Sequence, residues 1–120
     1  GCDYGRWIGM MTDSPKRYEI YFADLNPTVG GEIRKVRPVV VISQSEMNQF
    51  LNTVVACPLT SVLHPQWRSR LQIECAGKKA EIAVDQIRTI SKQRLKNKID
   101  KLSAGDAIQL RRIITEMYGE

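Results

Sequence analysis

Short β-type segments follow one another along most of this chain, and no long helical segment separates them. Residues 17–25 alternate polar and apolar side chains, and residues 38–43 and 53–61 are rich in valine and isoleucine. Parallel strands need long crossover connections, which are usually helices, and the chain has no such βαβ rhythm. The pattern therefore predicts a small, mostly antiparallel β-barrel.

Turn-forming residues divide these segments. Residues 69–75 and 80–85 flank a short Ala-Gly-Lys-Lys run, and this arrangement predicts a β-hairpin. The other connections are expected to be a loop at 26–32, one helical turn within 44–52, a loop at 62–68, and an irregular segment with a turn or strand at 86–95.

One helix is expected, at the C-terminal end of the chain. Ser103 and Asp106 have the spacing of a capping-box-like pair, so the helix is predicted to begin at Ser103. Five later residues share one face at helical spacing, and this face is interpreted as core or dimer interface: Ala107, Leu110, Ile114, Met117 and Tyr118.

The length of 120 residues favours a single domain with one hydrophobic core. Residues 1–15 show no periodicity, and Met10-Met11 suggests a natural start there. We therefore expect residues 1–15 to be an N-terminal extension, partly vector-derived or disordered. Residues 16–120 are expected to form the single functional domain.

The chain is basic, with a formal net charge of +5. This balance favours a polyanionic partner such as nucleic acid, an acidic protein segment or an anionic membrane, although a merely soluble basic surface would look the same. No apolar run approaches the roughly 20 residues of a membrane span, and no signal core is visible, so a cytoplasmic location is expected.

The three cysteines, Cys2, Cys57 and Cys75, fit neither zinc spacing nor a disulfide framework, and Cys57 is expected in the core.

Several known kinds of catalytic site are excluded because this sequence lacks the residues that they need. His64 is the single histidine, so a ribonuclease with one histidine as base and another as acid cannot be built from one protomer. Gly30-Gly31 lacks the Gly-Lys-Ser/Thr of a phosphate cradle, and no nucleophile elbow is present. An enzyme of this sequence is expected to work without a metal or cofactor, through arginine, lysine, threonine, serine and backbone groups.

Three stretches, "ADLNPTVGGEIRKVRPVVVIS", "VVACPLTS" and "AVDQIRTISKQRL", stand in an order and spacing that resemble the MazF/PemK family, the toxins of type II toxin–antitoxin systems. The resemblance implies an SH3-like barrel of antiparallel strands with a C-terminal helix, the fold shared by CcdB-like and MazF-like toxins. It implies a homodimeric mRNA interferase, a sequence-specific and ribosome-independent endoribonuclease. Such enzymes cut single-stranded RNA without metal and leave a 2′,3′-cyclic phosphate and a 5′-hydroxyl. It also implies an antitoxin that docks an acidic, flexible segment in the RNA groove, with DNA reached only through that antitoxin.

Carried over by motif, the family's catalytic arginine before a proline is Arg37, and its catalytic threonine at the end of the next strand is Thr60. Ile33 stands where the family often has glutamine in the first loop, so the cleavage sequence does not transfer. The residues implied in substrate binding are Glu32, Arg34, Lys35, Ser61 and Gln86, and no metal ligand is implied.

The chemistry favours Arg37 as a stabiliser of charge on the phosphate, because a guanidinium grips two phosphate oxygens at once. A guanidinium keeps its proton far above neutral pH, and removing that proton near pH 7 costs roughly 8 kcal/mol, which argues against Arg37 as general base. The base stays unassigned, with Glu32 as a candidate.

Two rival functions remain open. A gyrase-poisoning toxin of the same barrel type acts through an apolar C-terminal tail, whereas this chain ends Tyr118-Gly119-Glu120. A noncatalytic RNA-binding module would bind RNA with salt dependence and cut nothing.

Trp67 either stacks on a base or is a partly buried loop residue. The basic tract from Arg88 to Lys101 is either a solvated face or a phosphate track.

Overall fold

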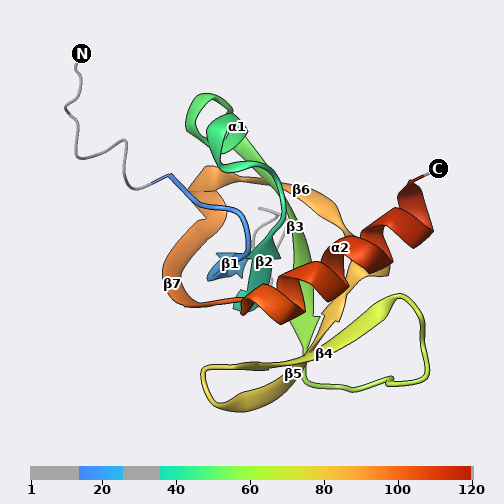
Figure 1. The fold of residues 1–120 in the computed structure, drawn as a ribbon. Helices are drawn as coiled ribbons and strands as arrows, with labels where there is room; N and C mark the ends of the chain where they lie inside the picture. Colours follow the sequence, from blue (N-terminus) through green and yellow to red (C-terminus); the bar gives the residue numbers. More distant parts are fainter. Residues whose placement is uncertain (1–13, 26–35, 120) are drawn as a thin grey trace.

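The computed structural model describes residues 14–25 and 36–119. These residues form a curled sheet crossed by a C-terminal helix, with a short helix at the other end of the sheet (Figure 1). The elements are β1 (Glu19–Asp24), β2 (Val36–Val41), α1 (Ser45–Phe50), β3 (Thr53–Thr60), β4 (Arg70–Cys75), β5 (Lys78–Ala83), η2 (Val84–Gln86), β6 (Arg88–Ser91), η3 (Lys92–Arg94), β7 (Leu95–Lys101) and α2 (Ala104–Tyr118).

The sheet has the strand order β4-β5-β3-β2-β1-β7, and β6 pairs with β3 beside this path. Every strand pair that the described residues form is antiparallel, which confirms the prediction from the missing crossover helices. Within the described residues, the end strands β4 and β7 do not pair with each other, so the sheet forms a half-barrel. Helix α2 covers one side of it (Figure 1).

The valine run of β2 is buried on both of its faces. Val40 belongs to one core cluster, which includes Ile20 of β1 and Leu110 of α2. Val39 and Val41 point into a second cluster on the other face of the sheet. A continuous apolar run rather than strict alternation is the pattern expected of a strand covered on both sides.

Helix α2 begins as predicted. The Ser103 hydroxyl accepts the N–H of Asp106 at 3.1 Å and caps the helix. Leu110 is fully buried, and Ile114 is half-buried beside Ile113, which the predicted face did not include. Met117 and Tyr118 are more exposed, although the Tyr118 hydroxyl donates to the Val84 carbonyl at 3.0 Å.

The predicted hairpin is formed by β4 and β5, with Ala76 and Gly77 as its turn. The irregular segment predicted at 86–95 contains the end of η2, the strand β6 and the 3-10 turn η3. The strand β7 that follows was not anticipated separately, because its lysine-rich sequence lacks an apolar alternation. No helix among the described residues is long and apolar enough to cross a membrane.

Candidate active site

The candidate site lies where β2 and β3 separate. β2 pairs with β1 along most of its length, but with β3 only from Val39 to Val41. The last pair on that side joins Val39 to Pro58. Continuing the same register by two residues places Arg37 opposite Thr60, on the same face of the sheet. The two residues implied in catalysis therefore lie on neighbouring strands just beyond the last pair, and both line the same groove.

Arg37 is exposed and is fixed at its backbone. It pairs with Ala23 of β1, and Pro38 follows it opposite Phe22. The missing N–H of Pro38 is tolerated because β3 does not pair with β2 at this position. No carboxylate of the described residues lies within ion-pair distance of Arg37, so its guanidinium is available for a ligand.

Thr60 is the last residue of β3, and its hydroxyl is held by its own chain. The Val62 N–H donates to Thr60 Oγ1 at 3.1 Å. A hydroxyl has one hydrogen to donate and can accept twice, so this bond fixes the oxygen and leaves the hydrogen for a ligand. Thr60 is therefore a preset donor in the groove that Arg37 also lines.

Arg37, Thr60 and Ser61 line one groove of about 480 Å³. The apolar lining comes mainly from Phe22, Leu59 and Ile99, and the remaining wall comes from the tip of the β4–β5 hairpin. The charged residues in the lining are all cationic: Arg37, Lys78 and Lys79. Sequence reasoning missed the two lysines, because nothing in the sequence shows which way the hairpin turns.

The other predicted substrate residues lie apart from this groove or outside the described residues. Gln86 is exposed at the end of η2 and does not line the groove. Glu32, Arg34 and Lys35, together with Ile33, fall in the range 26–35, which the structure does not describe. Their predicted roles remain predictions.

A buried charge cluster supports the strand that ends at Thr60. Glu81 lies opposite Thr60 on β5, and its side chain is fully buried. Arg70, whose side chain is 6% exposed, donates to Glu81 at 2.7 Å and to Asp85 at 2.9 Å. Glu81 Oε1 also accepts from Gln72 Nε2 at 2.6 Å and from the His64 N–H at 2.5 Å. The cluster joins β4, β5, η2 and the loop after β3.

The pKa values of both carboxyls are held low. Burial raises the pKa of Glu81, but the hydrogen bonds from His64, Arg70 and Gln72 outweigh it, so the net pKa lies below its ordinary value. Burial acts in the same direction on Asp85, and the guanidinium of Arg70 reverses it. Both groups are therefore anions at neutral pH, which matches their pairing with Arg70.

Trp67 is half exposed and forms part of a stack in the loop after β3. The rings of His64 and Trp67 are parallel, with centroids 3.9 Å apart. The Arg70 guanidinium lies over the Trp67 ring, 4.7 Å from its centroid. Trp67 is thus held in place by both His64 and Arg70. His64 lies in the predicted loop at 62–68, between β3 and β4. The contacts of Trp67 with its own chain favour the interpretation as a partly buried loop residue over stacking on a base.

The described cysteines are not nucleophiles. Burial raises the pKa of Cys57 to about 12, and burial followed by the charge of Asp100 raises the pKa of Cys75. The thiols are therefore neutral near pH 7. The buried position of Cys57 confirms the prediction of a core residue. Across residues 14–25 and 36–119, no cluster of three or more metal-ligating side chains occurs.

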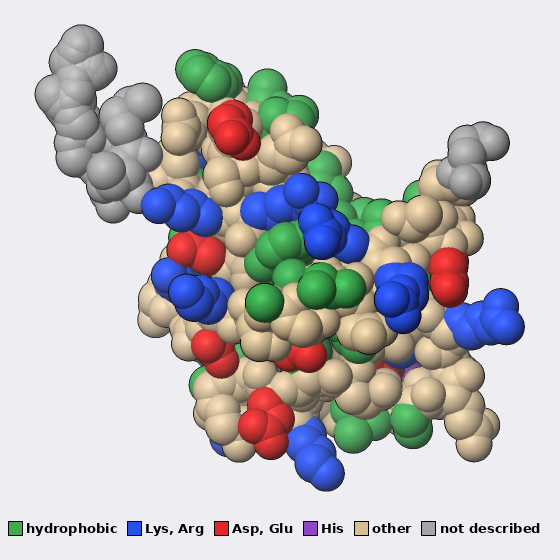
Figure 2. All heavy atoms as spheres, in the orientation of Figure 1, with side chains coloured by type: hydrophobic (Ala, Val, Ile, Leu, Met, Phe, Trp, Pro, Cys, Tyr) green, Lys and Arg blue, Asp and Glu red, His purple; other side chains and the backbone are tan. Residues whose placement is uncertain are grey.

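Several cations of the basic tract serve the fold. Lys98 pairs with Glu19 at 2.8 Å, Lys92 Nζ donates to the Asn48 carbonyl at 2.6 Å, and Arg94 donates to the Asp24 carbonyl at 3.1 Å. Figure 2 shows Lys and Arg side chains dispersed over one face rather than merged into a single patch. This arrangement favours the interpretation as a solvated face over that as a continuous phosphate track.

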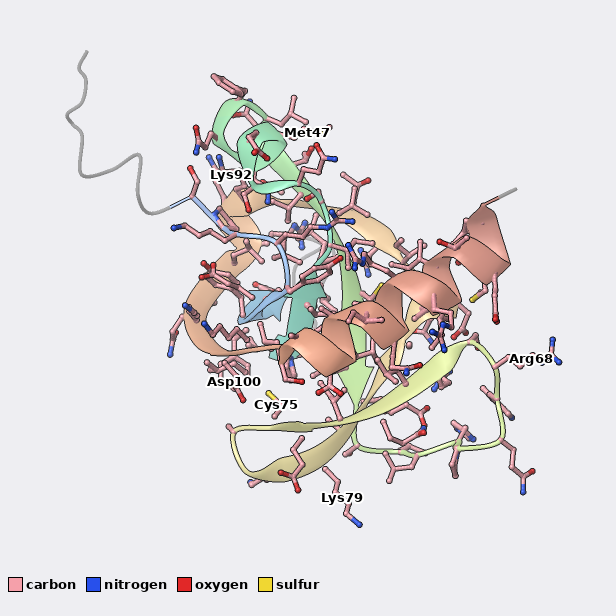
Figure 3. All side chains as sticks on the ribbon, viewed as in Figure 1. Met47, Arg68, Cys75, Lys79, Lys92 and Asp100 are labelled. Carbon is pink, nitrogen blue, oxygen red and sulfur yellow. The ribbon has the colours of Figure 1, made fainter. Side chains whose placement is uncertain are left out.

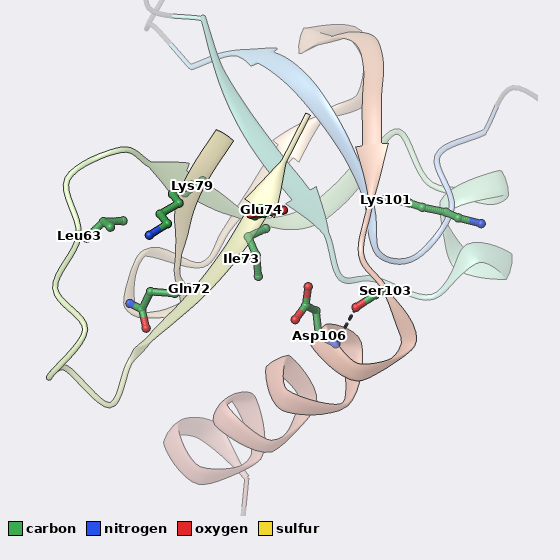
Figure 4. A pocket seen from close by; sticks show the side chains of 9 residues that line it. Leu63, Gln72, Ile73, Glu74, Lys79, Lys101, Ser103 and Asp106 are labelled. Atoms are coloured by element: carbon green, nitrogen blue, oxygen red, sulfur yellow. Dashed lines mark hydrogen bonds between the residues drawn. The ribbon is translucent and has the colours of Figure 1, made fainter. Parts of the chain in front are cut away.

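A second hollow, of about 610 Å³, lies between the β4–β5 hairpin and the first turn of α2 (Figure 4). Its lining balances Glu74 and Asp106 against Lys79 and Lys101. A polyanion gains little from such a balanced surface. The groove of Arg37 and Thr60, with cations alone, is the better binding site for phosphates.

Comparison with known proteins identifies the family of this chain. The family model described as PemK-like, MazF-like toxin of type II toxin–antitoxin system matches residues 16–118. Endoribonuclease EndoA of Bacillus subtilis (strain 168) is 39% identical over 93 residues, covering 72% of this chain and 79% of the relative. Endoribonuclease MazF of Staphylococcus epidermidis is 34% identical over 100 residues, covering 79% and 83%.

Solved structures show the same fold at lower identity. A MazE–MazF crystal structure (Form-II) from Deinococcus radiodurans matches with a TM-score of 0.77 at 19% identity, covering 88% of this chain and 96% of that one. A mycobacterial endoribonuclease in complex with its cognate antitoxin matches with a TM-score of 0.75 at 18% identity, covering 88% and 95%. The fold and the sequence relatives agree with the predicted family: this chain belongs to the PemK-like, MazF-like toxins of type II toxin–antitoxin systems.

Proposed function

We propose that this chain is a metal-independent endoribonuclease toxin that cuts single-stranded mRNA in the groove between Arg37 and Thr60. The observation that carries the proposal is that both residues line one groove where the pairing of β2 with β3 ends. The family membership and the relatives named as endoribonucleases support it. Sequence-specific cleavage independent of the ribosome is part of the proposal.

The reaction is an attack of the RNA 2′-OH on the adjacent phosphorus. The 2′-oxygen forms the new P–O bond and loses its proton, while the bond to the 5′-oxygen breaks and that oxygen gains a proton. The products are a 2′,3′-cyclic phosphate and a 5′-hydroxyl. No redox change and no covalent enzyme intermediate are needed, so a nucleophilic side chain is not required.

Arg37 stabilises the charge that develops on the phosphate oxygens. Its guanidinium is exposed, has no carboxylate partner among the described residues, and carries a fork of donors that fits two oxygens. Thr60 donates one further hydrogen bond, with its oxygen already fixed by the Val62 N–H. A preset donor of this kind is typically worth about 10²–10³ in rate.

The proton transfers are divided between Arg37 and a base. A fully charged guanidinium is a poor base, because removing its proton near pH 7 costs roughly 8 kcal/mol. We assign Arg37 the role of stabiliser and acid toward the leaving oxygen, and Glu32 is the candidate base. Ser61 lines the groove and assists in phosphate binding. Gln86, which lies outside the groove lining, is the candidate for base contact.

The partners follow from the family. We propose a homodimer that is inhibited by a cognate antitoxin, whose acidic, flexible segment competes with RNA for the cationic groove. DNA is contacted only through that antitoxin. Since the substrate is mRNA, the proposed site of action is the cytoplasm, and the functional domain is residues 16–120.

One incubation tests the proposal against its rivals. The pure protein is mixed with a long single-stranded RNA in the presence of EDTA, and the fragment ends are mapped. Discrete fragments with 2′,3′-cyclic phosphate ends are expected. Intact RNA together with inhibited DNA supercoiling would instead indicate a gyrase-poisoning toxin. Intact RNA with salt-dependent binding would indicate a noncatalytic RNA-binding module.

A further inference from the structure

The tip of the β4–β5 hairpin forms a wall of the groove that holds Arg37 and Thr60. Its turn residues Ala76 and Gly77 have φ values of +52° and +82°, and two positive φ values are what a two-residue type I′ turn requires. Cys75 pairs with Lys78 immediately beside the turn, and both line the groove. The geometry of the turn therefore decides which side chains reach the candidate site.

Asp100 ties this tip to the rest of the sheet. The Ala76 N–H donates to Asp100 Oδ2 at 2.9 Å, and the Lys101 N–H donates to Oδ1 at 2.8 Å. These two bonds lower the pKa of Asp100, so it stays a carboxylate acceptor at neutral pH. Figure 3 shows Cys75 and Asp100 beside each other at this point. The tip is thus held against β7, next to the groove-lining Ile99.

Lys78 is the cation of the hairpin that faces inward. Side chains alternate along a strand, so Lys78 shares its face with Ala80 and Ile82, which both pack in the core cluster. Its cross-strand partner Cys75 is buried. Lys79 belongs to the opposite face, and in Figure 3 its side chain extends away from the body of the protein.

Lys78 also has nothing to neutralise it. Its side chain is exposed, and none of the carboxylates in residues 14–25 and 36–119 lies within ion-pair distance of it. Lysine is a compact point charge that binds phosphate without needing a planar fit. A free ammonium group at the wall of a groove lined by cations alone is suited to a chain of phosphates.

We propose that Lys78 forms a second phosphate-binding subsite, which holds a phosphodiester next to the one that Arg37 and Thr60 act on. The inference rests on the proposed ribonuclease function and adds a residue to it. Lys78 positions the RNA backbone and carries no sequence information, because phosphates are the same at every nucleotide. Its effect therefore falls on binding rather than on the chemical step.

The test measures binding of a strand that this chemistry cannot cut. A labelled single-stranded DNA of about 20 nucleotides and mixed sequence lacks the 2′-OH, and its affinity is followed by fluorescence anisotropy as salt is raised. Each phosphate contact contributes about 0.7 to the slope of log affinity against log salt for single strands. Lys78→Gln is expected to reduce the slope by about 0.7 and the affinity about fivefold near 0.1 M salt.

Two further variants serve as controls. Lys78→Arg keeps the charge and is expected to keep the wild-type slope. Arg112→Gln removes an exposed cation of α2 outside the groove lining and is expected to leave slope and affinity unchanged. A wild-type slope for Lys78→Gln, or no salt-dependent binding by the wild type, would overturn the subsite.

Cleavage kinetics separate this inference from the proposed function. In an RNA cleavage assay, the Lys78→Gln variant is expected to have a KM about fivefold above that of the wild type. Its kcat is expected to differ from the wild-type value by less than about twofold. A large loss of kcat with unchanged KM would contradict a binding role. Wild-type protein that binds the DNA strand through Lys78 but never cuts RNA would instead refute the proposed function and leave the subsite standing.

Discussion

Replacing Arg70 by leucine tests the buried charge cluster under the candidate site. Arg70→Leu removes the guanidinium that pairs with Glu81, and both side chains are at most 6% exposed. Removing one partner of a buried ion pair typically costs 3–5 kcal/mol, because the other charge is left uncompensated. Glu81 keeps its hydrogen bonds from His64 and Gln72, so we expect the lower end, about 3 kcal/mol.

The other contacts of Arg70 add little to this loss in free energy of unfolding. Asp85 is 35% exposed, and an ion pair with such access to water is worth about 1 kcal/mol or less. The guanidinium over Trp67, which is half exposed, contributes roughly 0.5–1 kcal/mol. The expected total loss in free energy of unfolding is therefore about 4 kcal/mol, most of it from the uncompensated charge of Glu81.

Urea denaturation at pH 7 and a fixed protein concentration measures the loss. Arg111→Leu, which removes an exposed cation of α2, is the matched control and is expected to change stability by less than about 0.5 kcal/mol. Arg70→Leu combined with Glu81→Leu is expected to be more stable than Arg70→Leu alone, with a coupling energy above about 1 kcal/mol. A loss below about 1 kcal/mol for Arg70→Leu, or strictly additive effects, would refute the reasoning.

Three further predictions follow from particular contacts. The pKa values of Glu81 and Asp85 are lowered from their ordinary values of 4.5 and 3.8, so the stability that these carboxylates contribute is complete above about pH 5 and is lost as the pH falls below these values. Urea denaturation of the wild type at decreasing pH should show this loss. A free energy of unfolding that rises on acidification would contradict the prediction. Thr60→Val keeps the shape of the side chain but removes the hydroxyl donor, and it is expected to slow RNA cleavage about 100-fold. Thr60→Ser keeps the hydroxyl and should retain most of the activity. Equal rates for the two variants in a cleavage assay would exclude the hydroxyl as donor. Leu110→Ala empties a fully buried position where α2 meets the sheet and is expected to cost about 2–5 kcal/mol in thermal or urea unfolding, while the same change at the exposed Ile108 should cost far less.

Much of the fold was predictable because its signals are local. The valine run of β2, the Ala76-Gly77 turn and the Ser103 cap each depend on neighbouring residues only. The identity of Arg37 and Thr60 also followed from motifs in the sequence. Their placement in one groove did not, because it depends on the register of β2 against β3 and on the residue at which the two strands part.

The residues that sequence reasoning missed act through long-range contacts. Glu81 alternates along β5 in the manner of a solvent-facing residue, and only the loop after β3 and Arg70 make its position buried. Lys78 is an ordinary hairpin cation until the bond between Ala76 and Asp100, 24 residues apart, sets the tip beside the groove. Neither contact has a local signal, so the structure was needed to find them.

The central claim is that Arg37 is the cation on which RNA cleavage depends. The most direct measurement is the single-turnover rate of RNA cleavage in EDTA by Arg37→Ala, with its fold verified by circular dichroism and its thermal melting compared with that of the wild type. Because Arg37 is exposed and has no ion-pair partner among the described residues, its removal should leave the fold intact. We predict a rate reduced at least about 100-fold. A folded Arg37→Ala protein that cleaves RNA at a near wild-type rate would contradict the account.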